Sequence, residues 1–223
     1  MSEVAIRQKF PRIFEMRIGC VPAHFTVKLQ LRKDIKPKYF KERDVPFALR
    51  QLLEIELEKL QREKIISPII ASDWGSPLVL IPKADDTVRT CVDYKMTVNK
   101  CLVNVNYPIR RIDEIINSLC GSRYFCRLDL YKAYLHIPVD DSSAAIQTIT
   151  THKGTFKMHR LSYGIKVAPA EFNRIIDQIL RGLSGVISYF DNIVVHGATK
   201  EQCFKNLLDC LQRLHENDLH LNT

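Results

Sequence analysis

The stretch from Gly185 to Gly197, GVISYFDNIVVHG, constrains the fold of this chain more than any other. Short apolar runs flank Asp191 and Asn192, and two such runs separated by a pair of turn-forming residues are typical of a β-hairpin. The hairpin would place the carboxylate of Asp191 at the tip of an apolar strand pair. Because Asp-Asn also suits a turn through its backbone preferences, a structural role for Asp191 is the simpler interpretation of this stretch alone.

A second carboxylate stands at the end of another apolar stretch. Asp129 lies near the end of Tyr124–Leu130 (YFCRLDL), which has the composition of a β-strand. Carboxylates at the ends of adjacent strands repel each other unless a divalent cation lies between them, and magnesium prefers a few carboxylates together with substrate phosphates. Two such ions, about 4 Å apart, activate an attacking hydroxyl and stabilise the leaving oxygen in nucleotidyl transfer. The alternative for Asp129 is a strand-end cap or an ion pair with Arg127 or Lys132.

Composition narrows the classes of function. The chain has 33 Lys and Arg against 25 Asp and Glu, a net charge of +8, which suits polyanionic partners and equally an ordinary basic protein. Its seven cysteines form no C-x-x-C pair, as is typical of reduced thiols in an intracellular protein. Arg7, Lys9 and Arg12 interrupt the first apolar residues, and no apolar run reaches membrane-spanning length. We therefore expect an intracellular protein, in the cytoplasm, in a particle or in the nucleus, that is neither secreted nor membrane-bound.

Several well-known catalytic patterns are missing from the sequence. It has no H-E-x-x-H, no P-loop and no dinucleotide-binding G-x-G-x-x-G. The seven histidines are scattered without ligand spacing, so zinc is not expected. Ser162 and Ser188 have no identifiable His and Asp partners in the sequence, which argues against nucleophilic hydrolysis.

The periodicity of apolar residues predicts the helices. Leucines at helical spacing predict a helix over about 46–64, and a similar stripe predicts a short helix ending near Gly121. The clearest helical stripe runs from Phe172 to Leu183. Thr199 and Gln202 have the spacing of a capping box and predict the start of a last helix.

Short alternating runs predict the strands. Hairpins are predicted over 74–92 and over 146–159, and alternation predicts a strand at Phe25–Leu31 within a loosely organised arm of residues 1–45. Strands and helices interleave without a regular βαβ rhythm. We therefore expect an α+β fold rather than a doubly wound sheet.

Four stretches together resemble the reverse transcriptase of gypsy-type LTR retrotransposons. VPFALRQLLEIELEKLQREKIISPI, followed by SDWGSPLVLIPKADDTVRTCVDYKMTVN, resembles the family's fingers entry. YPIRRIDEIINSLCGSRYFCRLDLYKAYLHIPV resembles the segment with the first catalytic aspartate. THKGTFKMHRLSYGIKVAPAEFNRIIDQIL resembles the L-P-F-G…A-P-A-x-F-Q segment, and SYFDNIVV resembles the Y-x-D-D hairpin. The motifs occur in the family's order, and the similarity runs from about residue 10 to the end.

This resemblance implies an incomplete right-hand polymerase fold of fingers and palm, with an antiparallel palm sheet backed by helices. It implies an N-terminal arm over 1–45, fingers over 46–100 and 139–162, and a palm over 101–138 and 163–223. The chain stops before the family's K-C-x-F stretch, so primer grip and thumb are expected to be absent and primer–template to be held poorly. Protease, ribonuclease H and integrase domains would accompany it in a full element.

The resemblance also implies roles for single residues. In the implied reaction, a primer 3′-hydroxyl attacks the α-phosphate of a dNTP on an RNA or DNA template. Asp129 and Asp191 would hold Mg²⁺ or Mn²⁺, helped by the backbone carbonyl of Leu130. Tyr134 would exclude a ribose 2′-hydroxyl, and Tyr189 would lie near the primer terminus. The other nucleotide contacts would come from Lys83, Arg89, Tyr163 and Gly164.

Departures from the family's pattern fall on the same motifs. Asn192 stands where Y-x-D-D has its second aspartate, so the catalytic set is degenerate, and an amide binds a hard cation less well than a carboxylate. Ser162 replaces the proline of L-P-F-G, Asn173 replaces the glutamine of A-P-A-x-F-Q, and Glu171 stands at a usually apolar position. We therefore expect a polymerase fragment with weak or no activity. The alternative is a non-catalytic nucleic-acid-binding or interaction module derived from a retroelement.

Overall fold

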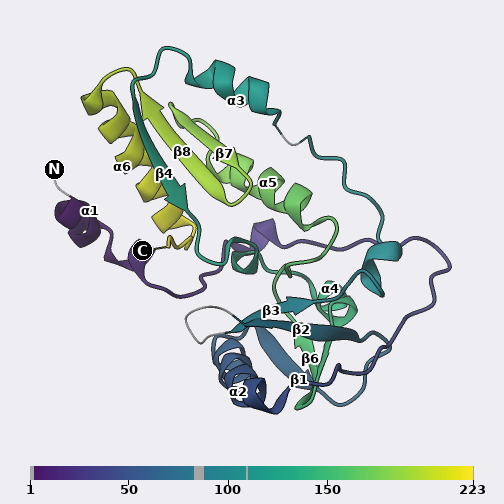
Figure 1. The fold of residues 1–223 in the computed structure, drawn as a ribbon. Helices are drawn as coiled ribbons and strands as arrows, with labels where there is room; N and C mark the ends of the chain where they lie inside the picture. The colour runs from purple at the N-terminus through teal and green to yellow at the C-terminus, as the bar shows by residue number, and fades with distance from the viewer. Residues whose placement is uncertain (1–2, 83–87, 109, 223) are drawn as a thin grey trace. The chain divides into compact units, whose positions relative to one another are not determined.

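The computed structural model describes residues 3–82, 88–108 and 110–222 of this chain, which fold into helices and sheets as expected for an α+β protein (Figure 1). The chain divides into two compact units, each assembled from separate stretches of sequence. The first unit comprises Met1–Phe25, Val105–His136 and Pro169–Thr223, and the second comprises Thr26–Asn104 and Ile137–Ala168. Residues 1–45 are thus shared between the two units.

The first unit is built on a three-stranded antiparallel sheet with the order β4-β8-β7. The strands are β4 (Tyr124–Asp129), β7 (Val186–Tyr189) and β8 (Asn192–Gly197). Residues paired across antiparallel strands lie on the same face of a sheet, and successive residues alternate between faces. The register therefore places Asp129, Asn192 and Tyr189 on one face. It places Leu128, Ile193 and Ser188 on the opposite face.

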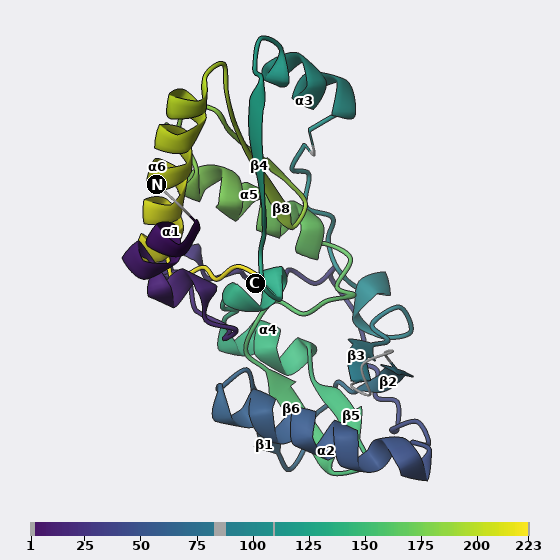
Figure 2. The ribbon, with the colours of Figure 1, turned by 60° about the vertical axis from the view of Figure 1, so that its left-hand side comes forward.

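Helices α5 (Ala168–Ile179) and α6 (Lys200–Glu216) cover one face of this sheet (Figure 2). The stripe of Phe172, Ile175 and Ile176 on α5 is fully buried, as its spacing predicts. Helix α6 begins at the predicted capping box, where Thr199 Oγ1 accepts a hydrogen bond from the Gln202 N–H at 3.2 Å. Shorter helices complete the unit: α1 (Glu3–Lys9), η1 (Pro11–Phe14), η2 (Ala23–Phe25), α3 (Ile112–Leu119) and η4 (Ala133–His136).

The second unit contains a five-stranded mixed sheet with the order β1-β6-β5-β2-β3. Only the β2–β5 pair is parallel among these described strands. The leucine stripe predicted a helix over 46–64, and α2 (Phe47–Arg62) buries Leu53, Leu57 and Leu60. The strands are β1 (Ile66–Ile69), β2 (Ser76–Pro82), β3 (Val88–Val92), β5 (Ile149–Thr151) and β6 (Gly154–Met158), and the remaining helices are η3 (Val98–Lys100) and α4 (Asp141–Ile146).

Two local predictions need correction. Phe25–Leu31 forms no strand: Val27 and Leu31 make single bridges, to Val139 and Leu102, which join the segment to its unit without building a ladder. The hairpin predicted from residue 146 begins at β5 instead, because Asp140 caps α4 by accepting from the Ser143 N–H at 2.9 Å. Within the described residues, none of the helices combines the length and apolarity that crossing a membrane requires.

Candidate active site

The turn of the central hairpin lies one residue earlier than predicted. Tyr189 pairs with Asn192, so Phe190 and Asp191 form the turn and Asn192 is the first residue of β8. Phe190 has a φ of +52°, in the left-handed region that costs a non-glycine residue about 1–2 kcal/mol. Its ring packs edge-on against Tyr189 with centroids 4.6 Å apart. A bulky residue held in this conformation marks a turn whose shape is imposed by its surroundings.

The register brings the two predicted acids to the same end of the sheet. Asp129, the last residue of β4, pairs with Asn192, the residue next to Asp191. The Leu130 N–H donates to the Asp191 carbonyl at 3.2 Å, and the Asn222 N–H donates to the Asp129 carbonyl at 2.8 Å. The backbone on both sides of the carboxylates is therefore fixed by hydrogen bonds, and the condition for a shared cation, that the two strands are neighbours, is met.

Neither carboxylate has a cationic partner among the described residues. Asp129 is half-buried at the end of β4, and among the described residues it makes no ion pair with Arg127, one of the two structural alternatives for it. Asp191 is exposed, and its Oδ1 accepts a hydrogen bond of 3.3 Å from the Asn192 side-chain amide. At that length the bond is weak, so both carboxylates retain most of their capacity to bind a positive group.

Tyr134 lies beside this acidic end of the sheet. Its ring packs edge-on against Phe172 of α5, with centroids 5.0 Å apart. Burial, together with the negative charge of Asp191, raises the pKa of the Tyr134 hydroxyl. The tyrosine is therefore neutral at physiological pH and stands close enough to Asp191 to sense its charge.

The first unit thus gathers Asp129, Leu130, Tyr134, Tyr189, Asp191 and Asn192, while Arg89, Tyr163 and Gly164 belong to the second unit. Arg89 lies in β3, with its backbone opposite Ile81. Lys83 lies outside the described residues. Tyr163 and Gly164 lie in a loop before α5, where Gly164 has a φ of +88°.

Asn99 holds the loop that contains Tyr163 and Gly164, and sequence analysis did not identify it. Its side-chain amide donates to the Gly164 carbonyl at 2.7 Å, and its Oδ1 accepts from the Lys166 N–H at 2.8 Å. A Cβ on Gly164 would lie 3.0 Å from the Val92 carbonyl. The loop therefore needs both a glycine and the amide of Asn99, and no short-range pattern in the sequence indicates this pairing.

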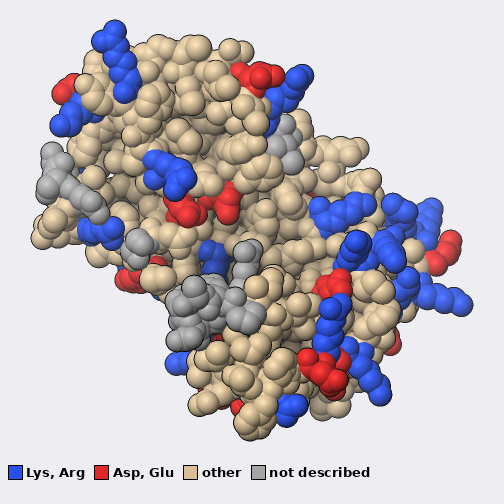
Figure 3. Space-filling model, viewed as in Figure 1, with Lys and Arg blue, Asp and Glu red and all other residues tan. Residues whose placement is uncertain are grey.

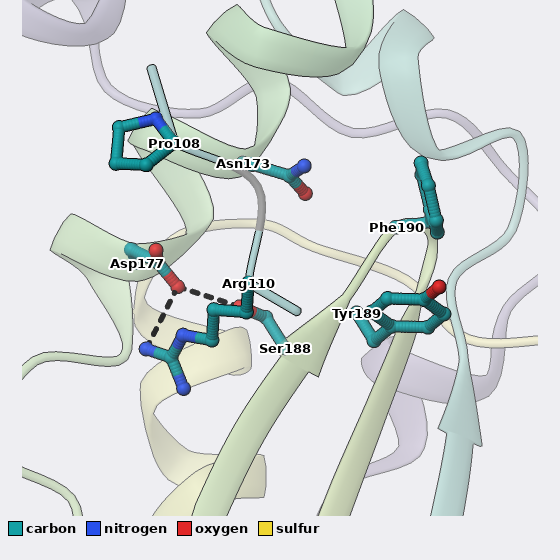
Figure 4. Close-up of a pocket in the computed structure, with 7 residues that line it drawn as sticks. All are labelled: Pro108, Arg110, Asn173, Asp177, Ser188, Tyr189 and Phe190. Carbon is teal, nitrogen blue, oxygen red and sulfur yellow. Dashed lines mark hydrogen bonds and ion pairs between the residues drawn. The ribbon is translucent and has the colours of Figure 1, made fainter. Parts of the chain in front are cut away.

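A pocket lies beside the hairpin turn, within the first unit (Figure 4). It is lined by Pro108, Arg110, Asn173, Asp177, Ser188, Tyr189 and Phe190. Asn173, the residue at the family's glutamine position, is buried there. Sequence analysis did not predict a role for Asp177, whose carboxylate accepts hydrogen bonds from both Arg110 and Ser188.

The donor set of the acidic end suits a hard divalent cation. Within the described part of the chain no group of three or more His, Cys, Asp and Glu side chains could hold a metal ion. Asp129 and Asp191 therefore offer two carboxylates, and the Leu130 carbonyl belongs to the residue that follows Asp129. Magnesium is commonly bound by one or two carboxylates and completes its shell with water and substrate phosphates, so these residues fit it.

Comparison with known proteins identifies the family. Residues 81–223 match the model of the reverse transcriptase (RNA-dependent DNA polymerase) family. Related sequences include an uncharacterised protein of Caenorhabditis elegans, 31% identical over 96% of this chain and 17% of that protein. The Pol polyproteins of transposons 412 and opus of Drosophila melanogaster are 31% and 32% identical, over 94% and 96% of this chain and 18% and 22% of theirs. The chain belongs to the reverse transcriptase family and spans about a fifth of these relatives.

Solved structures agree on the fold. The protease–reverse transcriptase of prototype foamy virus superposes with a TM-score of 0.88 over 98% of this chain and 29% of the viral one, at 19% identity. The foamy viral enzyme in complex with an RNA/DNA hybrid gives a TM-score of 0.85 over the same shares, also at 19% identity. The expected α+β fold of fingers and palm is therefore confirmed.

Proposed function

We propose that this chain adds deoxynucleotides to a primer 3′-hydroxyl on an RNA or DNA template, at a rate reduced by Asn192. The observation that supports this most is the pairing of Asp129 with Asn192, together with the hydrogen bond from Leu130 to the Asp191 carbonyl. It brings two carboxylates, neither with a cationic partner in the part of the chain that the structure describes, to one end of a sheet in a reverse transcriptase fold. The first unit is then the palm and the second the fingers of a gypsy-type element.

Asp129 and Asp191 would hold Mg²⁺ or Mn²⁺, with the Leu130 carbonyl as a further ligand. When bound, the metal lowers the pKa of the primer hydroxyl and neutralises charge on the phosphates. Tyr134 would bind beside the sugar and exclude a 2′-hydroxyl, since its ring packs edge-on against Phe172 and its hydroxyl lies within reach of the charge of Asp191. Tyr189, on the same sheet face as Asp129, would contact the primer terminus.

The second unit would supply the remaining nucleotide contacts. Lys83 and Arg89 would bind the triphosphate through charge-assisted hydrogen bonds. Tyr163 and Gly164 would line the nucleotide and template pocket, in the loop that Asn99 holds. Protease, ribonuclease H and integrase domains of a polyprotein are proposed as covalent neighbours, because the relatives of this chain are several times longer.

Asn192 would limit the reaction in two ways. Its amide provides no negative charge to a hard cation, and it donates a hydrogen bond to the Asp191 carboxylate that should act as a ligand. The missing charge lowers the affinity for metal. The hydrogen bond from Asn192 must be broken or rearranged before Asp191 can bind a metal ion through Oδ1.

Primer extension tests this proposal. The chain is incubated with a DNA primer on an RNA template and dNTPs, in Mg²⁺ and in Mn²⁺. We expect slow extension that is lost in Asp129→Ala and preserved in Asp209→Asn, a control on an exposed part of α6. Extension by Asp129→Ala at the rate of the unchanged chain would contradict the assignment. Fast extension by the unchanged chain, lost in Asp129→Ala, would contradict the claim of impairment.

A non-catalytic nucleic-acid-binding module is the second candidate, supported by charge on the second unit. Figure 3 shows Lys and Arg side chains gathered there. The exposed basic residues of one segment are Lys28, Arg32, Lys33, Lys36, Lys38, Lys41 and Arg43. This candidate predicts binding to an RNA/DNA duplex that weakens steeply with salt and is unchanged in Asp129→Ala. An absence of binding at low salt, where phosphate contacts are strongest, would exclude it.

A further inference from the structure

The carboxylate of Asp177 joins three segments of the first unit. Asp177 lies on α5, and its Oδ2 accepts a hydrogen bond of 2.7 Å from the Tyr107 hydroxyl. Its Oδ1 accepts one of 2.6 Å from the Ser188 hydroxyl of β7 and one of 3.3 Å from Arg110 Nη2 (Figure 4). We call Asp177 and these three donors the Asp177 anchor.

The hydrogen bonds of the Asp177 anchor are of a kind that contributes strongly to stability. The Asp177 side chain is only 18% exposed, and a carboxylate in that position is stable only when donors surround it. Hydrogen bonds to an ionised acceptor are about twice as strong as neutral ones. The Tyr107 hydroxyl is the donor in its bond, because an ionised carboxylate only accepts, and burial followed by this bond raises the pKa of Tyr107.

The strand held by the anchor lacks support on one side. β7 is an edge strand of the β4-β8-β7 sheet, so β8 is its single partner among the described strands. Ser188 lies on the helix-covered face, and the next residue, Tyr189, lies on the opposite face with Asp129. The anchor therefore holds β7 from the α5 side at Ser188, the residue before Tyr189, which is expected at the primer terminus.

The Phe190-Asp191 turn, which follows β7, needs contacts that hold it in place. Phe190 is held in the left-handed region, and strained residues persist only where surrounding contacts over-determine them. On one side the turn is fixed by the bond from Leu130 to the Asp191 carbonyl. On the β7 side, the Tyr189–Asn192 pair closes the turn, and the nearest side-chain hydrogen bond among the described residues is that of Ser188 to Asp177, two residues before Phe190.

We propose that Asp177 is a positioning residue of the polymerase site. By holding Ser188, it fixes Tyr189 and the Phe190-Asp191 turn relative to Asp129, and so keeps the two metal-binding carboxylates at a constant separation. This inference rests on the proposed function for its purpose. Its geometry stands on the Asp177 anchor alone.

The principal measurement needs no turnover. Backbone amide hydrogen exchange is followed at residues 186–193 in the unchanged chain, in Asp177→Asn and in the control Asp209→Asn. We expect exchange in this segment to be at least tenfold faster in Asp177→Asn, with rates in α6 unchanged. Equal exchange in Asp177→Asn and Asp209→Asn would overturn the proposal.

Ser188 provides a milder pair of variants if Asp177→Asn does not fold. Ser188→Ala removes one hydroxyl, whereas Ser188→Thr keeps a hydroxyl at the same position. We expect faster hairpin exchange in Ser188→Ala and a return toward the unchanged rate in Ser188→Thr. Equal acceleration in both variants would show that packing, and not the bond to Asp177, holds the strand.

Binding of Mn²⁺ separates this inference from the proposed function. In titrations followed by the electron paramagnetic resonance of free Mn²⁺, we expect binding by the unchanged chain to weaken about fivefold in Asp177→Asn and not in Asp209→Asn. A chain that binds no Mn²⁺ would contradict the proposed function, while the hydrogen-exchange result would still decide the role of Asp177. Unchanged Mn²⁺ affinity in Asp177→Asn, with faster hairpin exchange, would reduce Asp177 to a structural residue.

Discussion

Asp177 and Asp191 lie on either side of the same hairpin and have opposite surroundings. Asp177 accepts hydrogen bonds from Tyr107 and Arg110, which lie in one segment before α3, and from Ser188 of β7. Asp191 receives one weak bond, from the neighbouring Asn192, and Asp129 beside it has no cationic partner among the described residues. The fold satisfies the first carboxylate and leaves the other two available. Structural and ligand-binding acids can therefore be told apart by which of them the protein's own donors already occupy.

Removing Asp129 should show the largest effect on function and almost none on stability. In Asp129→Ala we expect primer extension to fall about a hundredfold or more, because even groups that only support a metal's ligands are worth 10–100-fold. The free energy of unfolding should change by less than about 0.5 kcal/mol, because no partner is left unpaired. Urea denaturation and primer extension on the same preparation measure both. A stability loss above 2 kcal/mol would place Asp129 with the satisfied carboxylates.

Removing the charge of Asp177 should lower the stability of the fold, in contrast to the removal of Asp129. We expect Asp177→Asn to lower the free energy of unfolding by about 2 kcal/mol, since hydrogen bonds to a charged group contribute about 1.5–3 kcal/mol. Urea denaturation beside Asp209→Asn, which should change stability by less than about 0.5 kcal/mol, provides the comparison. Equal stability of the two variants would contradict the claim that Asp177, unlike Asp129 and Asp191, stabilises the fold.

Adding a charge at Asn192 should sharpen the contrast. Asn192→Asp restores the family's second aspartate and places a third carboxylate beside Asp129 and Asp191. Without metal, we expect stability to fall by about 1 kcal/mol, because like charges repel at close range. With Mn²⁺, stability should recover and extension should rise about tenfold. The thermal midpoint with and without Mn²⁺ tests this, and a loss that Mn²⁺ does not reverse would contradict it.

Sequence reasoning found the two available acids because each stands out in its own stretch. Asp129 and Asp191 are lone carboxylates at the ends of apolar strands, and a strand pair needs only local signals to be recognised. The helices α2, α5 and α6 were predicted for the same reason, since their stripes repeat within a few residues. The family resemblance then added the pairing of the two strands, which periodicity alone does not provide.

What could not be predicted depends on partners far apart in the sequence. Asp177 sits between apolar positions of α5 and looks like an ordinary solvated residue. Its role comes from Tyr107, 70 positions earlier in the chain. The hairpin turn was misplaced by one residue because Asp-Asn suits a turn locally, whereas Phe190 at a φ of +52° does not. The pairing of Tyr189 and Asp129 with Asn192 overrides that local preference.

The smallest expected effect is a pH dependence carried by Tyr107. Its pKa in the folded chain is raised, by burial first and then by the bond to Asp177, so folding favours the protonated hydroxyl. This contribution is fully present below the ordinary tyrosine pKa of about 10 and is lost as pH rises through the higher folded value. Unfolding by urea at several pH values from 8 to 11, compared with Tyr107→Phe, isolates the contribution of Tyr107, because the other tyrosines titrate in both proteins.

The unchanged chain should lose stability relative to Tyr107→Phe above about pH 10. In an Asp177→Asn background the difference should shrink to what burial alone produces, since the charge that opposes ionisation of Tyr107 is gone; a difference of the same size in both backgrounds would show that Asp177 does not govern this hydroxyl.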